Sequence, residues 1–96
     1  MRFRFEWDEQ KARANTGKHG VSFEEAMSVF LDPLAATIFD RDSSVGEKRW
    51  ITIGTGESRL LLVVHTSMEL ADDETIIRII SARRPTRREA KQYEEG

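Results

Sequence analysis

Arginine side chains gather near the end of the chain, in the segment IIRIISARRPTRREAKQY that runs from Ile76 to Tyr93. An apolar run with strand character gives way to a proline-containing turn and then to a helical pattern. The cations at or beyond the strand end are Arg83, Arg84, Arg87, Arg88 and Lys91. Because the guanidinium fork matches phosphate oxygens, the segment predicts a surface that handles nucleic acid. The alternative is a solvated helix face paired with Glu89, Glu94 and Glu95.

Proton-transfer groups elsewhere in the chain could support a reaction on such a surface. In RNA the ribose 2′-hydroxyl can attack its own phosphate, so cleavage needs neither a metal ion nor an enzyme nucleophile. The protein must accept a proton, donate one, and stabilise negative charge on the phosphate oxygens. We therefore expect a metal-free reaction without a cofactor. The candidate groups are His19, Glu47, His65 and Tyr93.

A second group of cations lies on the helix that is predicted to follow Asp8. Lys11, Asn15 and Lys18 recur at helical spacing and form one polar stripe. His19 comes at the helix end, where the helix dipole favours a protonated imidazole. We expect the two lysines to contact phosphate and His19 to transfer a proton. The alternative is a C-terminal cap in which Lys18 and His19 satisfy the last carbonyls.

Strand alternation places charged side chains among aliphatic ones. It puts Arg83 on the same face as Ile79, and it puts His65 and Arg49 among the aliphatic residues of their own strands. Arg78 falls on the other face of its strand. A charged or imidazole side chain in such surroundings either has a partner or points into a cleft. For Arg49, His65 and Arg78, a structural hydrogen bond or ion pair is the alternative.

The composition predicts one globular domain that spans residues 1–96. The formal net charge is -2 and the pI is about 5.7, so any nucleic-acid binding must be local. Cysteine is absent, which excludes disulfides and thiolate chemistry. The chain has no apolar signal segment and no apolar run of about 20 residues. We expect a cytoplasmic protein that does not contact a membrane.

The local patterns predict an α+β fold with the element order β-α-α-β-β-β-β-α. An alternating strand at 3–7 precedes a helix from Asp8 to Gly17, and a capping box of Ser22 with Glu25 begins the second helix. That helix is expected to bury a stripe from Phe23 to Leu31. Four strands are then predicted at 36–40, 48–53, 59–66 and 74–82, separated by turns at 41–47 and 54–58 and an acidic loop at 68–73.

The last helix is predicted to begin with a second capping box, formed by Thr86 and Glu89. Because consecutive strands are joined by short turns, we expect an antiparallel sheet with the helices gathered on a face or at an end.

The chain resembles the BrnT family of toxins along nearly its whole length. The resemblance rests on FEWD at 5–8, KHGVSFEEA at 18–26, FLDP at 30–33, GEKRW at 46–50, LLVVHT at 61–66 and RIISAR at 78–83. It continues through Arg87, Arg88, Glu89 and Tyr93. Each motif alone is weak, but together and in this order they are specific.

The resemblance implies a RelE-like fold and a ribonuclease toxin of a type II toxin–antitoxin pair, which cleaves RNA to arrest translation. It also implies a BrnA-like antitoxin whose ribbon-helix-helix domain binds operator DNA, so that the toxin meets DNA only through the antitoxin. The matching positions are Lys18, His19, Glu47, Arg49, His65, Arg83, Arg88 and Tyr93.

These observations give a specific hypothesis for the site. Arg83, Arg49 and Lys18 would hold the scissile phosphate, and His19 or His65 would transfer protons, with Glu47 as a further candidate. Tyr93 would orient the substrate or donate a proton, and all these groups must meet in one pocket. Further RNA phosphates would contact Lys11, Arg84, Arg87 and Arg88. The alternative is a non-catalytic subunit that engages an antitoxin or operator DNA in an autorepression complex.

Overall fold

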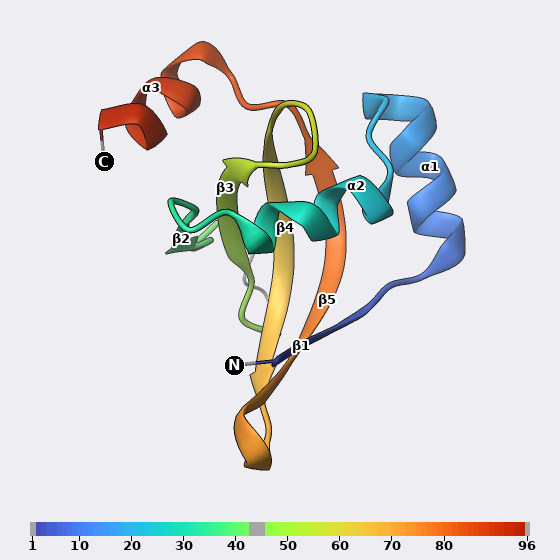
Figure 1. The fold of residues 1–96 in the computed structure, drawn as a ribbon. Coiled ribbons are helices and arrows are strands. Elements are labelled where there is room, and N and C mark those ends of the chain that lie inside the picture. Colours follow the sequence, from blue (N-terminus) through green and yellow to red (C-terminus); the bar gives the residue numbers. More distant parts are fainter. Residues whose placement is uncertain (1, 43–45, 96) are drawn as a thin grey trace.

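The computed structural model describes residues 2–42 and 46–95, which form a mixed α+β fold with a five-stranded sheet and three α-helices (Figure 1). In chain order the elements are β1 (Arg2–Glu6), α1 (Glu9–His19), α2 (Phe23–Met27), the 3-10 helix η1 (Ser28–Leu31), β2 (Ala36–Phe39), β3 (Trp50–Thr55), β4 (Leu60–Glu69), the 3-10 helix η2 (Ala71–Asp73), β5 (Glu74–Arg83) and α3 (Arg87–Glu95). None of the described helices is long and apolar enough to cross a membrane. Part of the turn predicted at 41–47 lies outside the described residues.

The sheet is mixed, and the prediction of an antiparallel sheet is wrong for its first strand. The spatial order is β1-β5-β4-β3-β2, and the strands from β2 to β5 pair with one another in antiparallel fashion. β1 instead pairs in parallel with β5. Short turns predict antiparallel pairing only for strands that follow one another in the chain. Two α-helices and three strands separate β1 from β5, so this pair can be parallel.

One face of the sheet is covered by α2 and η1, and the core lies beneath them. Phe23, Ala26 and Val29 of these helices are fully buried against residues of β4 and β5 such as Val63 and Ile79. We call this the α2 face. The opposite face, which we call the open face, carries Arg4, Glu6, Thr66, Arg78 and Arg83, as the pairing of the strands requires.

A bulge in β5 decides which of its residues belong to each face. Val64 of β4 is opposite Ser81, but the next residue, His65, is opposite Ile79. Ile80 therefore has no partner and reverses the alternation of β5. As a result Ala82 is buried, whereas Arg83 lies on the open face. The prediction that Arg83 shares a face with Ile79 assumed strict alternation and is wrong for this reason.

α1 lies beside the upper half of β5, beyond the end of β1 (Figure 1). Its N-cap is Asp8, whose carboxylate accepts hydrogen bonds from the backbone of Gln10 and Lys11. The helix continues two residues beyond the predicted end at Gly17, to His19, and Gly20 closes it in the left-handed conformation at φ 69°.

A buried amide joins α1 to the sheet. Asn15 is 7% exposed, and its Nδ2 donates to the carbonyls of Val21 and Ala82 at 2.9 and 2.8 Å. Its Oδ1 accepts from the backbone N–H of Ala82 at 3.1 Å. The side chain thus takes the place of a neighbouring strand where β1 no longer reaches β5. The prediction that Asn15 belongs to an exposed polar stripe is wrong.

The second helix departs from its prediction in two ways. Ser22 caps α2 through the backbone N–H of Glu25 at 3.0 Å, but the Glu25 carboxylate does not reach back, because it binds Arg59 at 2.9 Å. Only half of the predicted capping box forms. The helix tightens into η1 after Met27, and this change of pitch leaves Leu31 81% exposed instead of buried.

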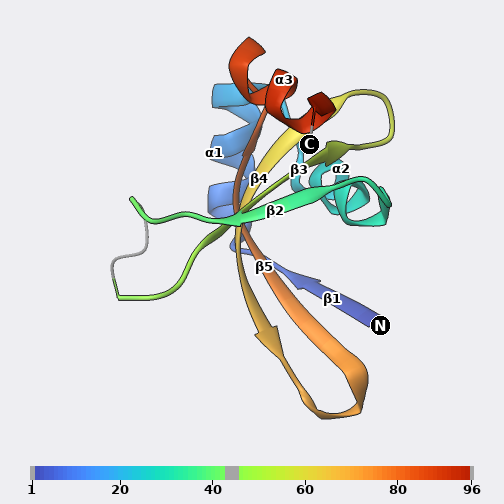
Figure 2. The ribbon, with the colours of Figure 1, turned by 90° about the vertical axis from the view of Figure 1, so that its left-hand side faces the viewer.

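The loop predicted at 68–73 is shorter than expected, because Met68 and Glu69 belong to a strand and only residues 70–73 lie outside the strands. β4 continues to Glu69 and β5 begins at Glu74, and the hairpin they form projects beyond the rest of the sheet (Figures 1 and 2). Leu70 and η2 separate them, and η2 contains two consecutive residues with positive φ, Asp72 and Asp73. The predicted capping box of Thr86 with Glu89 forms in both directions.

Removal of the Asn15 amide is expected to destabilise the protein. Asn15→Ala leaves the backbone N–H and C=O of Ala82 buried without partners, so we expect a loss of about 3 kcal/mol in the free energy of unfolding. Urea titration followed by tryptophan fluorescence measures this. Thr16→Ala is the control, since the exposed Thr16 hydroxyl bonds only to carbonyls of its own helix and the following turn. Equal losses in both variants would contradict the assigned role of Asn15.

Candidate active site

An acidic residue lies between two arginines at the open face. The Nη2 atom of Arg78 donates to both carboxylate oxygens of Glu47, at 2.8 and 2.6 Å. The Nε atom of Arg49 lies 3.6 Å from the same carboxylate. Glu47 precedes β3, Arg49 is the residue before that strand, and Arg78 comes from the middle of β5. Strand pairing between β3, β4 and β5 brings these three side chains together.

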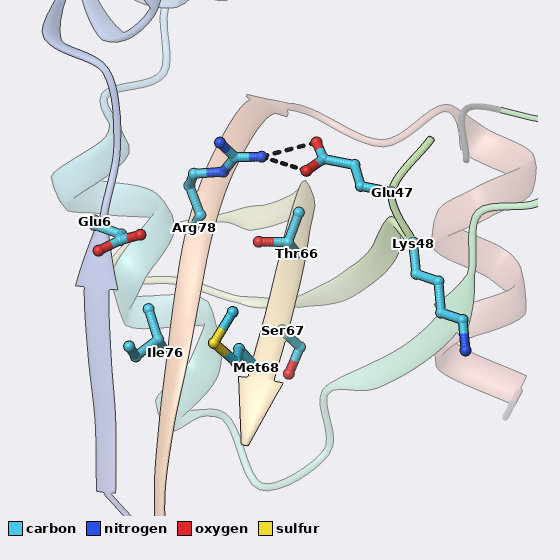
Figure 3. A pocket seen from close by; sticks show the side chains of 8 residues that line it. All are labelled: Glu6, Glu47, Lys48, Thr66, Ser67, Met68, Ile76 and Arg78. Atoms are coloured by element: carbon cyan, nitrogen blue, oxygen red, sulfur yellow. Dashed lines mark hydrogen bonds and ion pairs between the residues drawn. The ribbon is translucent and has the colours of Figure 1, made fainter. Parts of the chain in front are cut away.

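Glu47 and Arg78 border an open pocket with a volume of about 400 Å³ (Figure 3). Its walls come from β1, β4 and β5 and from the segment that precedes β3. The residues that line it are Glu6, Glu47, Lys48, Thr66, Ser67, Met68, Ile76 and Arg78. A cation and a carboxylate in hydrogen-bond contact, beside an accessible hollow, can hold an anion and accept a proton.

Arg83 is held by the first turn of α3. Its two terminal nitrogens donate to the two carboxylate oxygens of Glu89 at 2.9 and 3.0 Å, which is a fork-to-fork pair. Glu89 also accepts from the backbone N–H of Thr86. The hydrogen bonds from Arg83, with help from Thr86, lower the pKa of Glu89 to about 2 despite its partial burial. Arg83 therefore fixes the start of α3 to the end of β5.

Tyr93 anchors the other end of α3. Its hydroxyl donates to Oδ2 of Asp32 at 2.6 Å, and Asp32 also accepts from the backbone of Leu34 and Thr55. The bond from Tyr93 and these N–H groups lower the pKa of Asp32, and the same bond raises the pKa of Tyr93. Tyr93 is not among the residues that line the pocket beside Glu47.

His65 lies on the α2 face, with only 2% of its surface exposed. Its Nδ1 donates to the carbonyl of Thr66 at 3.1 Å, and its Nε2 shares a hydrogen bond of 2.7 Å with the hydroxyl of Thr52. The ring of Phe30 packs edge-on against the imidazole at 5.0 Å. Burial lowers the pKa of His65. A neutral imidazole satisfies these contacts, since Nδ1 carries the proton and Nε2 accepts from Thr52.

The structure therefore does not bring all the predicted site residues into one pocket. His65 and Arg83 lie on opposite faces of the sheet, so the expectation that both meet around one phosphate is wrong. The cause is the bulge at Ile80, which moves Arg83 to the open face. His19 is half-buried at the end of α1, and neither it nor the exposed Lys18 lines the pocket.

The remaining predicted phosphate ligands are exposed. Lys11 lies in the first turns of α1, and Arg84 lies between β5 and α3. Arg87 and Arg88 are in the first turn of α3. Within residues 2–42 and 46–95 none of these four forms an ion pair, whereas Lys91 lies 3.9 Å from Glu95. Among the described residues the alternative of a solvated helix face paired with acidic residues thus holds in part, for Arg83 with Glu89 and for Lys91 with Glu95.

Comparison with known proteins identifies the family. The family model for the ribonuclease toxin BrnT, of type II toxin–antitoxin systems, matches residues 7–89. The chain belongs to the BrnT family. No curated protein matches it at a significant level. The matched span contains Glu47, Arg49 and Arg78, so the cluster beside the pocket belongs to the part of the chain that this ribonuclease toxin family shares.

Glu47 is the one predicted site residue of this BrnT chain that lines the pocket. Among the other lining residues, Arg78 is predicted only as a charged residue on a strand, and Glu6 only as part of a motif. The signal for Arg78 is that it falls among β-branched residues in the middle of a strand, which is rare without a partner. For Glu6 the signal requires the parallel pairing of β1 with β5, which places it opposite Arg78.

The Arg83–Glu89 pair predicts a pH-dependent contribution to stability. Because the folded pKa of Glu89 is about 2 and its ordinary value is 4.5, the stabilisation is present above pH 4.5 and is lost as the pH falls toward 2. At pH 7 we expect Glu89→Gln to lose about 1 to 2 kcal/mol, after allowance for solvent screening. Urea unfolding at several pH values should show the difference from wild type narrowing in acid. Glu94→Gln on the same helix is the control, and a pH-independent difference would contradict the prediction.

The position of His65 predicts how it titrates. Because burial favours the neutral ring, its pKa in the folded protein should lie below the ordinary value of 6.5. Stability should consequently fall as the pH drops below about 6.5, where only the unfolded state takes up the proton. NMR of the imidazole resonances measures the midpoint, and the same titration in concentrated urea gives the reference. A midpoint at or above the urea value would contradict the neutral, hydrogen-bonded assignment.

Proposed function

We propose that this BrnT chain is a metal-independent endoribonuclease whose site is the Glu47–Arg78–Arg49 cluster. The observation that carries the proposal is a carboxylate in contact with Arg78 and within 3.6 Å of Arg49, at the edge of an accessible pocket. Family membership supplies the substrate class, RNA, and the open face supplies room for a strand of it. The cluster contains a proton acceptor and two cations for the phosphate oxygens, and water in the open pocket can supply the remaining proton.

In the proposed mechanism Glu47 accepts the proton of the ribose 2′-hydroxyl as that oxygen attacks the adjacent phosphorus. Arg78 and Arg49 stabilise the additional negative charge on the phosphate oxygens. Both contacts of Arg78 with Glu47 use the Nη2 atom, so Nη1 and Nε of Arg78 remain available for a phosphate. The products are a 2′,3′-cyclic phosphate and a 5′-hydroxyl, whose oxygen takes a proton from water in the open pocket.

The other predicted residues have supporting parts in this proposal. Arg84, Arg87 and Arg88 are exposed cations that can hold neighbouring phosphates of the RNA. Arg83 and Tyr93 position α3, which carries two of these arginines. His65 stabilises the junction of β3 and β4 through Thr52. Lys11, Lys18 and His19 extend the cationic surface at α1.

The proposed biological role is to arrest translation in the cytoplasm by cleaving RNA until an antitoxin binds. We propose a BrnA-like antitoxin whose ribbon-helix-helix domain contacts operator DNA, so that the toxin takes part in autorepression only through it. Large apolar side chains around β2 support a protein partner. Leu31, Leu34, Ile38 and Phe39 are 81%, 75%, 61% and 41% exposed. Ile38 and Phe39 are consecutive in β2 and point to opposite faces of the sheet, so both sides of this edge strand offer apolar area to a partner.

These exposed apolar side chains also favour the second candidate function, a non-catalytic subunit that only engages the antitoxin. The two candidates make different demands on the Glu47 cluster, since a binding subunit does not need a proton acceptor there. Incubation of the purified protein with total RNA in the presence of EDTA separates them. Fragmentation supports the nuclease, and retention of intact RNA or of antitoxin alone supports the binding subunit.

The proposal predicts the effect of removing the proton acceptor. Glu47→Gln keeps the size and the hydrogen-bonding reach of the side chain but cannot take up a proton, so cleavage in EDTA should fall by about 100-fold. The exposed pair contributes little stability, so the fold should be retained. Glu74→Gln is the matched control, because it removes the Arg4–Glu74 pair from the same face of the sheet. Full activity of a folded Glu47→Gln variant would remove Glu47 from the mechanism.

A further inference from the structure

The pocket beside Glu47 contains a second carboxylate that the proposed reaction does not use. Glu6 lies at the end of β1, directly opposite Arg78 in the parallel pairing with β5. It is exposed, and it forms no hydrogen bond or ion pair with the residues that the structure describes. Figure 3 shows Glu6 on one side of Arg78 and Glu47 on the other. Arg78 is thus bound to the carboxylate of Glu47, while the carboxylate of Glu6 is free to accept hydrogen bonds.

The strand register arranges the rest of the pocket in two rows on the open face. Glu6, Arg78 and Thr66 form a polar row across β1, β5 and β4. Ile76 and Met68 are paired with each other in the next row, about 7 Å along the strands, and Arg4 of β1, which is paired with Glu74, stands opposite Ile76. Met68 is 61% exposed, so this apolar row is accessible from the pocket. A flat ring can lie on the apolar row with one edge against the polar row.

The chemistry of Glu6 restricts which ring fits. A carboxylate accepts hydrogen bonds and repels phosphate, so in an RNA site it is suited to the N–H groups of a base and not to the backbone. Guanine presents two adjacent N–H donors, N1–H and the N2 amine, on its Watson–Crick edge. Adenine and cytosine present one amine beside an acceptor, and uracil presents one N–H between two carbonyls. The two oxygens of Glu6 therefore match guanine best.

We propose that Glu6, Ile76 and Met68 form a subsite that binds a guanine base of the RNA, next to the phosphate held by Arg78. The inference rests on the proposed function for its RNA substrate, and it makes Glu6 a specificity-determining residue. Exposed RNA loops and single strands offer their Watson–Crick edges to such a site, whereas paired RNA does not. The substrate class is then single-stranded RNA that contains guanosine.

Nucleotide binding tests the subsite without any cleavage. NMR titration of the full chain should show guanosine 3′-monophosphate binding about tenfold more tightly than uridine 3′-monophosphate, as a bidentate base contact implies. The amide signals of Glu6, Thr66 and Ile76 should move. In Glu6→Gln the amide presents one donor and one acceptor, so the two affinities should become similar. Equal affinities in the wild type, no binding at this pocket, or an unchanged ratio in Glu6→Gln would each overturn the proposal.

The cleavage pattern gives a second, separate readout. On an unstructured RNA in EDTA, the ratio of cuts beside guanosine to cuts beside uridine should fall by about tenfold in Glu6→Gln. Glu69→Gln is the control, since Glu69 lies at the end of β4 and lines a pocket with His65 and Phe30 on the α2 face. An unchanged ratio in Glu6→Gln would overturn the subsite. If no RNA is cut while guanosine 3′-monophosphate is preferred, the nuclease proposal fails and the base site stands.

Discussion

One extra residue in β5 determines how the chemistry of this protein is distributed over its sheet. Without the bulge at Ile80, Arg78 and Arg83 would lie on opposite faces, because they are five residues apart in one strand. With it, both arginines lie on the open face and Ala82 turns into the core. The bulge also presents the backbone of Ala82 to the amide of Asn15, which closes the strand edge that β1 leaves uncovered. The same irregularity thus places cations on one face and completes the core on the other.

The two arginines of β5 form ion pairs of different kinds, and this difference favours Arg78 over Arg83 as the phosphate ligand. Arg83 uses both terminal nitrogens in a fork-to-fork pair with Glu89, which a capping box also holds in place. A phosphate would have to break that whole arrangement. Arg78 contacts Glu47 through a single nitrogen, and both side chains are more than 40% exposed. It can therefore bind a phosphate while it keeps its contact with Glu47.

The sequence predicted the elements better than it predicted their relations in space. Local signals were sufficient for the N-caps Asp8 and Ser22 and for the capping box of Thr86 with Glu89, because those interactions form within one turn of chain. Features that depend on distant segments were missed. The parallel pairing of β1 with β5 and the bulge at Ile80 are set by how strands pack, and no local pattern encodes them.

In the candidate site, too, local signals indicated residue types but not which residues lie together. Glu47 and Arg49 are candidates from residue type and resemblance that the structure places side by side, whereas Arg83 is paired with Glu89 and His65 is buried. A histidine within a nearly continuous apolar run is more easily explained as a hydrogen-bonded core residue, as its contacts with Thr52 and Thr66 show. Residue type therefore indicated which chemistry is available, and only the pairing of strands indicated where it can occur.

The placement of charge in the pocket also constrains how RNA could lie on an acidic protein. In the proposed site phosphate is drawn to Arg78 and Arg49, while the unpaired carboxylate of Glu6 repels it from the end of β1. The sugar-phosphate backbone must then run on the side of Glu47, and the base must point across β5 toward Glu6 and the apolar pair of Ile76 and Met68. A strand bound in the opposite sense would bring its phosphate against Glu6. Arg78 has a carboxylate on each side, but Glu47 is paired with arginines and Glu6 is not. This difference sets the direction in which RNA would lie, which a uniformly cationic surface would not do.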